Sequence, residues 1–220
     1  MISIVNENKD VMEKQQDILV TQLFSSPVAI MAEEYVLSDQ ERKVIDELRE
    51  TGISGGDGGN ISSADHYLCD KPALKNLKDY FQRNLNAYAY DVMKIEESVT
   101  FYITQSWCNY NRKGTSHHKH WHANSVFSAV YFIDGDDTPI EFYRPIPMNN
   151  FYFPIKEYNT WNSESFWLPN QKNRLYIFPS TLVHSVFPNK SETTRMTISF
   201  NSFFKGKVGL YEGATELVLD

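Results

Sequence analysis

The spacing of hydrophobic residues along this chain changes near residue 98. Before it, apolar side chains recur every three or four residues, as on the buried face of an amphipathic helix; after it, they alternate with polar ones, as in a strand. The first part therefore predicts a helix-forming stretch at 10–23, a short strand at 28–31, and helices at 38–48 and 72–93.

Local signals mark where these helices begin. Ser38 and Glu41 form a capping box ahead of an apolar helical face, and Pro72 suits the first turn of the second helix. The segment 51–60 contains five glycines, whose backbone entropy disfavours a regular element, so a loop is expected there. No Lys-Ser or Lys-Thr pair follows these glycines, which disfavours a phosphate-binding loop.

Short strands joined by turns fill the second part of the chain. The expected strands are 101–110, 125–133, 139–143, 175–178, 184–187 and 194–204. In the first of them, Phe101, Trp107 and Asn109 alternate with Cys108 and Tyr110, so the two sets are predicted to lie on opposite faces. The pattern as a whole predicts an antiparallel barrel or sandwich, with the helices packed outside it.

Composition agrees with one mainly β domain. The length of 220 residues suits a single core, and the aromatic content of 14% favours a β-rich fold. We expect a single domain over 1–220, with a helical support layer at 1–97, a β core at 98–205 and a C-terminal tail at 206–220.

Charge and cysteine content limit the partners of the chain. The formal net charge is -7 and no stripe of Lys or Arg is visible, so nucleic acid is disfavoured. Cys69 and Cys108 are isolated, and we expect both to be reduced. Because the sequence has neither a signal peptide nor a run of eighteen apolar residues, we expect a cytoplasmic monomer or homodimer without a membrane partner.

Four of the six histidines crowd into one segment: His117, His118, His120 and His122. Residues i and i+2 of an extended chain point to the same face, so His120 and His122 are placed to bind one metal ion. His118 shares this parity and is an alternative to His122 as a ligand. For His117 and His118, a solvated histidine-rich turn is the favoured interpretation.

A strand near the C-terminal end carries one polar and one apolar face. The polar row is Arg195, Thr197, Ser199 and Asn201; the apolar row is Met196, Ile198 and Phe200. An apolar row packed against the helix layer leaves the polar row facing the barrel interior. A guanidinium buried there requires an anion, and a carboxylate bound through both oxygens is the natural partner of Arg195.

These residues form an ordered pattern: His-x-His at 120–122, His184 sixty-two residues later, and Arg195 eleven beyond it. The pattern resembles the 2-oxoglutarate/Fe(II) oxygenase superfamily, in particular its prolyl-4-hydroxylase-like branch in bacteria and phages. The similar segments are Ser106–Asn111, His120–Phe132, Phe178–His184 and Arg195–Asn201. The resemblance covers roughly residues 98–205 and implies a double-stranded β-helix core, Fe(II) as the metal, and 2-oxoglutarate and O2 as co-substrates.

The resemblance also implies roles for individual residues. The metal-ligand positions are matched by His120, His122 and His184. Arg195 matches the residue that binds the distal carboxylate of 2-oxoglutarate, and Ser199 matches a hydroxyl that assists it. Phe132 stands where relatives have a second tyrosine. The contact that this hydroxyl makes with the co-substrate is therefore expected from one of four other residues: Tyr131, Tyr102, Asn109 or Asn201.

His122 stands where most of the superfamily has a carboxylate. A neutral imidazole leaves one more positive charge at the metal, which should tighten binding of dianionic 2-oxoglutarate and weaken retention of Fe(II). Three histidines also suit Zn, Ni or Cu. The implied reaction couples decarboxylation of 2-oxoglutarate to succinate with hydroxylation of a C–H bond.

The resemblance implies a peptidyl proline or another protein side chain as substrate, and a small molecule stays open. Two other classes stay open as well: a cupin-like three-histidine metal protein that does not use 2-oxoglutarate, and a non-enzymatic binding module stabilised by zinc. The strand of Arg195 argues against the cupin-like class. The aromatic segment 146–172 is expected either to form a lid or groove wall, or to pack as a satellite cluster over the barrel.

Overall fold

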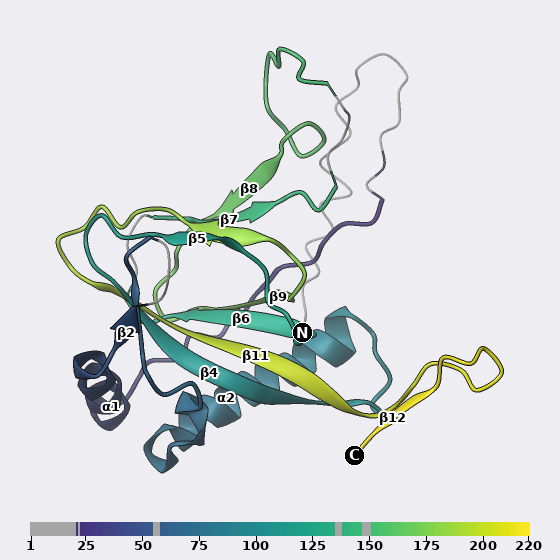
Figure 1. Ribbon diagram of the computed structural model, residues 1–220, viewed down its shortest axis with the longest axis horizontal. Coiled ribbons are helices and arrows are strands. Elements are labelled where there is room, and N and C mark those ends of the chain that lie inside the picture. Colours follow the sequence, from purple (N-terminus) through teal and green to yellow (C-terminus); the bar gives the residue numbers. More distant parts are fainter. Residues whose placement is uncertain (1–20, 22, 55–57, 135–137, 147–150) are drawn as a thin grey trace.

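Two antiparallel sheets face each other, and two helices pack on the outer side of the larger sheet (Figure 1). The predicted architecture, mainly β with flanking helices, is confirmed. The computed structural model describes residues 21, 23–54, 58–134, 138–146 and 151–220. The helix-forming stretch expected at 10–23 lies almost wholly outside these residues.

The larger sheet joins segments that are far apart in the sequence. In spatial order its strands are β1 (Ala29–Ile30), β9 (Leu175–Pro179), β6 (Phe127–Phe132), β11 (Arg195–Val208), β4 (Thr100–Asn111), β3 (Ile61–Ser62) and β2 (Ile53–Ser54), and β12 (Leu217–Leu219) pairs with β11. The long strands β4 and β11 lie side by side at its centre, so the polar row of β11 is held rigidly in the middle of the sheet.

The smaller sheet covers the inner face of the larger one. Its strands, in order, are β5 (His117–His120), β10 (His184–Val186), β7 (Ile140–Tyr143) and β8 (Ser165–Leu168). Apolar side chains fill part of the space between the sheets: Val130, Phe132, Ile140, Phe142, Tyr176, Phe178 and Leu182. This inner core leaves the ends of β5 and β10 close to the polar row of β11.

The helices follow the predicted signals. In α1 (Asp39–Glu50) the Ser38 hydroxyl accepts a hydrogen bond from the Glu41 amide at 3.3 Å, and the Glu41 carboxylate accepts one from the Ser38 amide at 2.8 Å. This reciprocal cap satisfies two amides that the helix itself leaves open. The second predicted helix consists of three consecutive pieces, η3 (Pro72–Leu74), α2 (Lys75–Ala87) and the π-helical η4 (Tyr88–Val92), and the short η2 (Leu68–Asp70) precedes it.

The main hydrophobic core lies between these helices and the larger sheet. Ile45 and Phe81 from the helices pack with Ile198 and Phe200 from β11, and all four side chains are fully buried. The Tyr110 hydroxyl donates to the Ile45 carbonyl oxygen at 2.6 Å, which ties α1 to β4. As predicted, the apolar row of β11 faces the helices, so its polar row faces the space between the sheets.

A bulge in β4 overturns the predicted face of Phe101. Phe200 pairs with Ser106 but Ser202 pairs with Ile103, so β4 carries one extra residue at this point. The extra residue reverses the alternation, and Phe101 packs in the helix-side core together with Cys108 and Tyr110. The prediction that Phe101 shares a face with Trp107 is therefore wrong, because regular alternation cannot anticipate an inserted residue.

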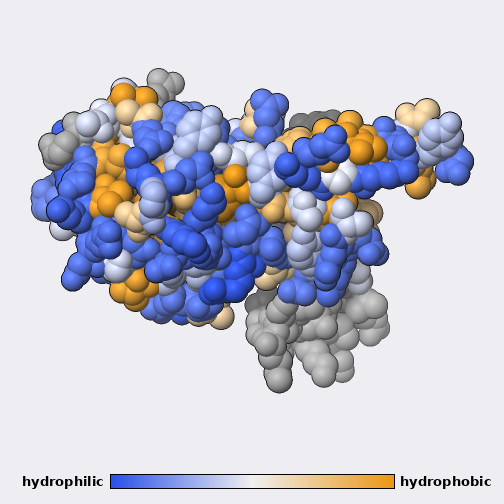
Figure 2. Space-filling view, turned by 90° about the horizontal axis from the view of Figure 1, so that it is seen from below, coloured by the Kyte–Doolittle hydropathy of each residue, from blue (hydrophilic) through white to orange (hydrophobic). Residues whose placement is uncertain are grey.

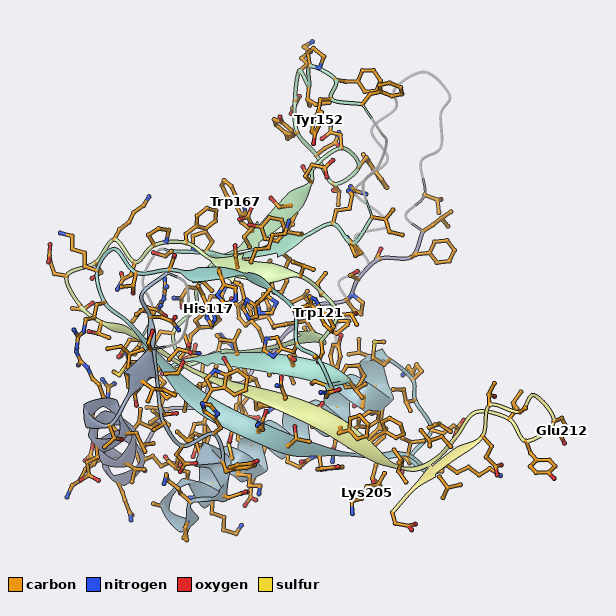
Figure 3. The ribbon with its side chains drawn as sticks, viewed as in Figure 1. His117, Trp121, Tyr152, Trp167, Lys205 and Glu212 are labelled. Carbon is orange, nitrogen blue, oxygen red and sulfur yellow. The ribbon has the colours of Figure 1, made fainter. Side chains whose placement is uncertain are left out.

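The aromatic segment 146–172 projects away from the two sheets and contains the unpredicted strand β8 (Figures 1 and 3). Several of its aromatic side chains are largely exposed: Phe151, Tyr152, Phe153, Phe166 and Trp167. None of the described side chains of this segment lines the histidine cavity, whereas Leu168 packs against the inner core and the Trp167 ring contacts that of Phe187. Trp167 contributes to the outer face of the smaller sheet, where its indole N–H donates to Glu141 at 3.0 Å.

The expected C-terminal tail returns to the sheet. β11 continues to Val208, and β12 pairs back along it as a hairpin that extends beyond the body of the molecule (Figures 1 and 2). Leu210, Leu217 and Val218 are exposed on this hairpin, beside a molecular face that is mostly hydrophilic. Both cysteines are free and buried. Of the helices in the described chain, none combines the length and apolar character that crossing a membrane requires.

Candidate metal centre

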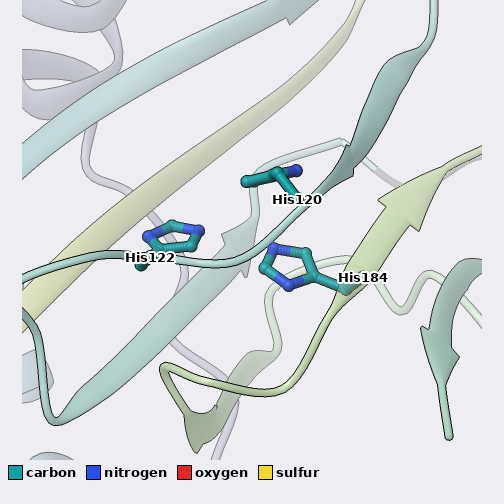
Figure 4. A group of neighbouring side chains, drawn as sticks. All are labelled: His120, His122 and His184. Carbon is teal, nitrogen blue, oxygen red and sulfur yellow. The ribbon is translucent and has the colours of Figure 1, made fainter. Parts of the chain in front are cut away.

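Three histidines from two neighbouring strands and the turn after one of them converge between the sheets. His120 ends β5 and lies opposite His184, the first residue of β10, in the antiparallel register, while His122 follows two residues after β5 (Figure 4). One ring nitrogen from each histidine lies within 4.8 Å of the others. The strand pairing thus places two of the side chains, and the turn at 121–122 brings the third alongside them.

In each of the three rings, Nδ1 forms a hydrogen bond with an oxygen acceptor. Nδ1 of His120 is 2.8 Å from the His118 carbonyl oxygen, and Nδ1 of His184 is 3.0 Å from the Leu182 carbonyl oxygen. Nδ1 of His122 is 2.6 Å from Oδ1 of Asn201. Because these oxygens only accept, every Nδ1 carries the hydrogen, and the lone pair of every ring lies on Nε2. Hydrogen bonds of this kind fix the tautomer of metal-binding histidines.

Burial keeps these imidazoles neutral. Desolvation lowers the pKa of His184 to about 3 and that of His122 to about 4, and it also lowers the pKa of His120. The neighbouring rings add to the effect at His184 and His122, since two protonated imidazoles would repel each other. Neutral imidazole is the form that binds a metal ion, so the cluster is ready to bind at neutral pH.

The arrangement fits a transition-metal ion. Nε2 of His122 is buried and has no hydrogen-bond partner among the described residues. A buried nitrogen lone pair without a partner is costly, and a metal ion shared with His120 and His184 would satisfy it. Three imidazole ligands suit Fe(II) and equally Zn, Ni or Cu, so the donor set alone defines the class of metal rather than the element.

A polar wall of β4 and β11 borders the same cavity. Arg195 is only 2% exposed, and its Nη2 donates to the Phe187 carbonyl oxygen at 3.3 Å. Thr197 and Ser199 follow it along β11, and Asn109 on β4 donates through Nδ2 to the Ser199 hydroxyl at 3.4 Å. The histidine nitrogens therefore border one part of the cavity, and a guanidinium with hydroxyl and amide groups borders another. An anionic ligand of the metal could bind to this guanidinium and these polar groups.

The four residues expected to contact the co-substrate in place of the missing hydroxyl lie in different parts of the structure. Asn109 lines the cavity, whereas Asn201 lies behind His122 and holds its ring. Tyr131 points to the helix side, where its hydroxyl donates to the Tyr35 carbonyl oxygen at 2.5 Å. Tyr102 is exposed beyond the bulge of β4. The structure thus brings Asn109, but neither Tyr131 nor Tyr102, to the cavity.

A second bulge, in β5, places His117 rather than His118 on the cavity side of the strand. His184 pairs with His120 but Val186 pairs with His117, so β5 carries an extra residue between the two pairs. His117 lines the cavity with its ring 4.5 Å from that of His120, while His118 is exposed. The cluster within 4.8 Å contains His122 rather than His118, and the interpretation of His117 as part of a solvated turn is corrected.

The two facing sheets and the three clustered histidines agree with what a comparison of the sequence with family models finds. Residues 105–201 match the family model described as "Putative 2OG-Fe(II) oxygenase", and this segment contains all three clustered histidines and Arg195. By this match residues 105–201 are similar to the 2-oxoglutarate/Fe(II) oxygenases, enzymes that need Fe(II), 2-oxoglutarate and O2. A search of curated proteins found no match.

Solved structures agree on the fold. A prolyl hydroxylase from Trichoplax adhaerens, solved with a hypoxia inducible factor peptide fragment, superposes with a TM-score of 0.53 at 12% identity, covering 80% of this chain and 83% of that one. A Pseudomonas putida prolyl-4-hydroxylase gives 0.51 at 14% identity, covering 84% and 95%. HygX from Streptomyces hygroscopicus, with nickel, 2-oxoglutarate and hygromycin B bound, gives 0.53 at 11% identity, covering 80% and 82%. At these identities the likeness establishes the double-stranded β-helix fold.

The depressed histidine pKa values predict how the stability of the metal-free protein depends on pH. Below pH 6.5 the unfolded chain takes up protons on its histidines, whereas native His122 and His184 stay neutral until about pH 4 and about pH 3. Stability is therefore fully present above pH 6.5 and falls as the pH drops towards these native values, by on the order of 2–4 kcal/mol. Urea unfolding in the presence of a chelator, repeated from pH 7 to pH 4, measures this.

A His184→Leu variant is the matched control, because it fills the buried volume with an apolar side chain and removes one of the histidines whose pKa is lowered. Its stability should fall less steeply over the same range. An identical slope in the variant and the parent protein would contradict the assignment of the pH dependence to the cluster.

Proposed function

We propose that this enzyme hydroxylates an uncharged side chain of a protein or peptide substrate. In this proposal Fe(II) is held by His120, His122 and His184, and the distal carboxylate of 2-oxoglutarate is held by Arg195 and Ser199. One observation carries the proposal: three neutral imidazoles and a buried guanidinium line the same cavity. The Nδ1 atom of each imidazole is hydrogen-bonded to the protein, which leaves Nε2 for a metal.

The protein contributes positioning and an environment that excludes water. The iron and its co-substrates, when bound, supply the oxidation of the C–H bond. Asn201 and two carbonyl oxygens fix the imidazoles, and Arg195 with Ser199 would hold the distal carboxylate of 2-oxoglutarate in the same cavity. Ile140, Phe178 and Val186 line the remaining wall with apolar atoms, which strengthens charge interactions inside the cavity.

A separate opening leads from the surface to the other side of the histidines. Its described lining residues are Ile53, Ser54, Ser62, His66, Gln105, Trp107, His117, His120, Trp121, His122, Ala123 and Asn201. None of them is a carboxylate, a lysine or an arginine. Trp107 is stacked on His122 with 5.8 Å between ring centroids, and Trp121 is half exposed at the mouth. A group that enters past these indoles and reaches the metal would therefore pack against apolar ring faces and meet no opposite charge among the described lining residues.

This lining favours an uncharged, compact group over an acidic or basic one. The edge strand β2 borders the opening, and an edge strand offers backbone groups that an extended peptide can pair with. The prolyl hydroxylase from Trichoplax adhaerens carries a peptide in its solved structure. These observations support a protein or peptide substrate, with a peptidyl proline as the first candidate to test.

The test is a search for oxygen addition in a proteome. Lysate is incubated aerobically with the Fe(II)-loaded enzyme and 2-oxoglutarate, and peptides that gain the mass of one oxygen atom are identified by mass spectrometry. We expect a small set of modified sites on uncharged residues with the parent enzyme and with His118→Ala, and none with His122→Ala. Modification confined to charged residues, or to small molecules in the extract, would contradict the proposed substrate class.

A further inference from the structure

The short strand β3 lies against the co-substrate wall although it falls outside the segment that matches the oxygenase family. The match begins at residue 105, whereas β3 covers Ile61–Ser62. β3 pairs with β4 so that Ile61 lies opposite Tyr110 and Ser62 lies opposite Asn109. Ile61 packs towards the helix-side core, so Ser62 points to the opposite face, which is the face of the cavity.

A chain of hydrogen bonds runs from Ser62 through the wall. The Ser62 hydroxyl donates to Oδ1 of Asn109 at 2.9 Å, and Nδ2 of Asn109 donates to the Ser199 hydroxyl oxygen at 3.4 Å. All three side chains are buried. The first bond fixes which end of the Asn109 amide points at Ser199. The second occupies a lone pair of Ser199, so the hydrogen of this hydroxyl is directed elsewhere, towards the cavity that it lines.

Two further asparagines near β3 have buried amide atoms without a hydrogen-bond partner among the described residues. These atoms are Nδ2 of Asn111 and both Nδ2 and Oδ1 of Asn60. Asn111 lies opposite Arg195 in the sheet, and Asn60 immediately precedes β3. An unsatisfied amide in a protein interior is costly, so the buried Nδ2 of Asn111, which lines the cavity opposite Arg195, supports a polar ligand at this wall.

We propose that β3 is part of the co-substrate site, with Ser62 as a positioning residue that acts through Asn109 on Ser199. This inference rests on the proposed function, because it needs 2-oxoglutarate in the cavity. Ser62 holds the Asn109 amide, the amide orients the Ser199 hydroxyl, and that hydroxyl donates to the carboxylate beside Arg195. Without Ser62, the amide is free to rotate and can present Oδ1 to Ser199, which then donates to the amide instead of the ligand.

Ser63 offers a matched structural control in the neighbouring position. It is buried, as Ser62 is, but its hydroxyl donates to the Asp65 carbonyl oxygen at 2.8 Å and accepts from the Cys108 amide at 3.1 Å. These bonds stabilise the fold and do not involve the cavity-lining residues. Ser63→Ala therefore reports the cost of losing a buried serine that has no part in co-substrate binding.

The experiment compares Ser62→Ala, Ser62→Thr and Ser63→Ala as Fe(II)-loaded proteins under anaerobic conditions. For each, 2-oxoglutarate affinity, Fe(II) affinity and melting temperature are measured. We expect Ser62→Ala to bind 2-oxoglutarate about 3- to 10-fold more weakly with unchanged Fe(II) affinity, the loss that one misdirected hydrogen bond produces. Ser62→Thr keeps the hydroxyl and should restore the affinity. Ser63→Ala should lower the melting temperature and leave 2-oxoglutarate affinity unchanged.

Other outcomes would contradict either the proposed function or the role of Ser62. Parent protein that binds Fe(II) but not 2-oxoglutarate would overturn the proposed function and this inference with it. Parent protein that binds 2-oxoglutarate, with Ser62→Ala at the same affinity, would overturn the role of Ser62 alone. The same would follow if Ser62→Ala and Ser63→Ala weakened 2-oxoglutarate binding equally, because the effect would then be one of general stability.

Discussion

Replacing His122 by alanine is expected to abolish Fe(II) binding while the fold is retained. The substitution removes one of three imidazoles whose ring nitrogens lie within 4.8 Å, and two remaining ligands leave a site at which water competes with the protein. Even a change behind a metal ligand costs about 10- to 100-fold in affinity, so the loss of a ligand should exceed about 100-fold. Metal analysis after gel filtration measures the binding, and circular dichroism on the same sample measures the fold.

The same result is expected for His120→Ala and His184→Ala. The controls are His118→Ala and His117→Ala, which remove imidazoles from the same segment but outside the cluster. Both should keep full iron occupancy. Iron retained by all three cluster variants would refute the assignment, and iron lost with His118→Ala but kept with His122→Ala would move the third ligand to the position that simple strand parity also allowed.

Alternation of polar and apolar residues predicted the parts of the site that lie on regular strands. The two faces of β11 were assigned correctly, because Met196, Ile198 and Phe200 pack in the helix-side core and Arg195 faces the cavity. His120 and His122 also lie together, but His122 lies outside β5 and is placed by the turn at 121–122 rather than by strand parity. The prediction for β11 succeeds because a strand without insertions converts sequence parity directly into a direction in space.

Bulges and very short strands are the parts that the sequence did not predict. One extra residue in β4 reverses the face of Phe101, and one in β5 brings His117 rather than His118 into the cavity. Neither insertion changes the polar and apolar pattern enough to be recognised. β3 has only two residues, too few for any period, so Ser62 could not be connected with Asn109 before the pairing of β3 and β4 was known.

Tyr131 is different, because the sequence did contain the relevant signal. Neighbouring residues of a strand point to opposite faces, and the resemblance placed the missing hydroxyl at Phe132 rather than at Tyr131. In the structure Phe132 lines the cavity and Tyr131 is buried on the helix side. Strand parity alone was therefore enough to exclude Tyr131 as the replacement for the missing hydroxyl.

Replacing Arg195 by methionine is expected to weaken 2-oxoglutarate binding by about two to four orders of magnitude. Arg195 is 2% exposed at the start of β11 and lines the cavity that the histidines border. Methionine keeps the apolar stem and removes the guanidinium, so packing should largely survive while the carboxylate loses a charge-assisted partner. Removing one member of such a buried pair costs roughly 3–5 kcal/mol, which corresponds to this loss of affinity. Fe(II) binding should be nearly unaffected, because Arg195 does not belong to the histidine cluster.

The measurement is an anaerobic titration of the Fe(II)-loaded variant with 2-oxoglutarate, followed by the metal-to-ligand charge-transfer band of the chelate and checked by calorimetry. Arg195→Lys is the matched control: it keeps a positive charge but loses the planar pair of donors, so its affinity should fall between those of the parent protein and Arg195→Met. Weakened binding of both Fe(II) and 2-oxoglutarate would point to a disturbed fold. Unchanged 2-oxoglutarate affinity in Arg195→Met would mean that the dicarboxylate is held elsewhere, and a three-histidine metal protein of the cupin kind would then explain the cavity better.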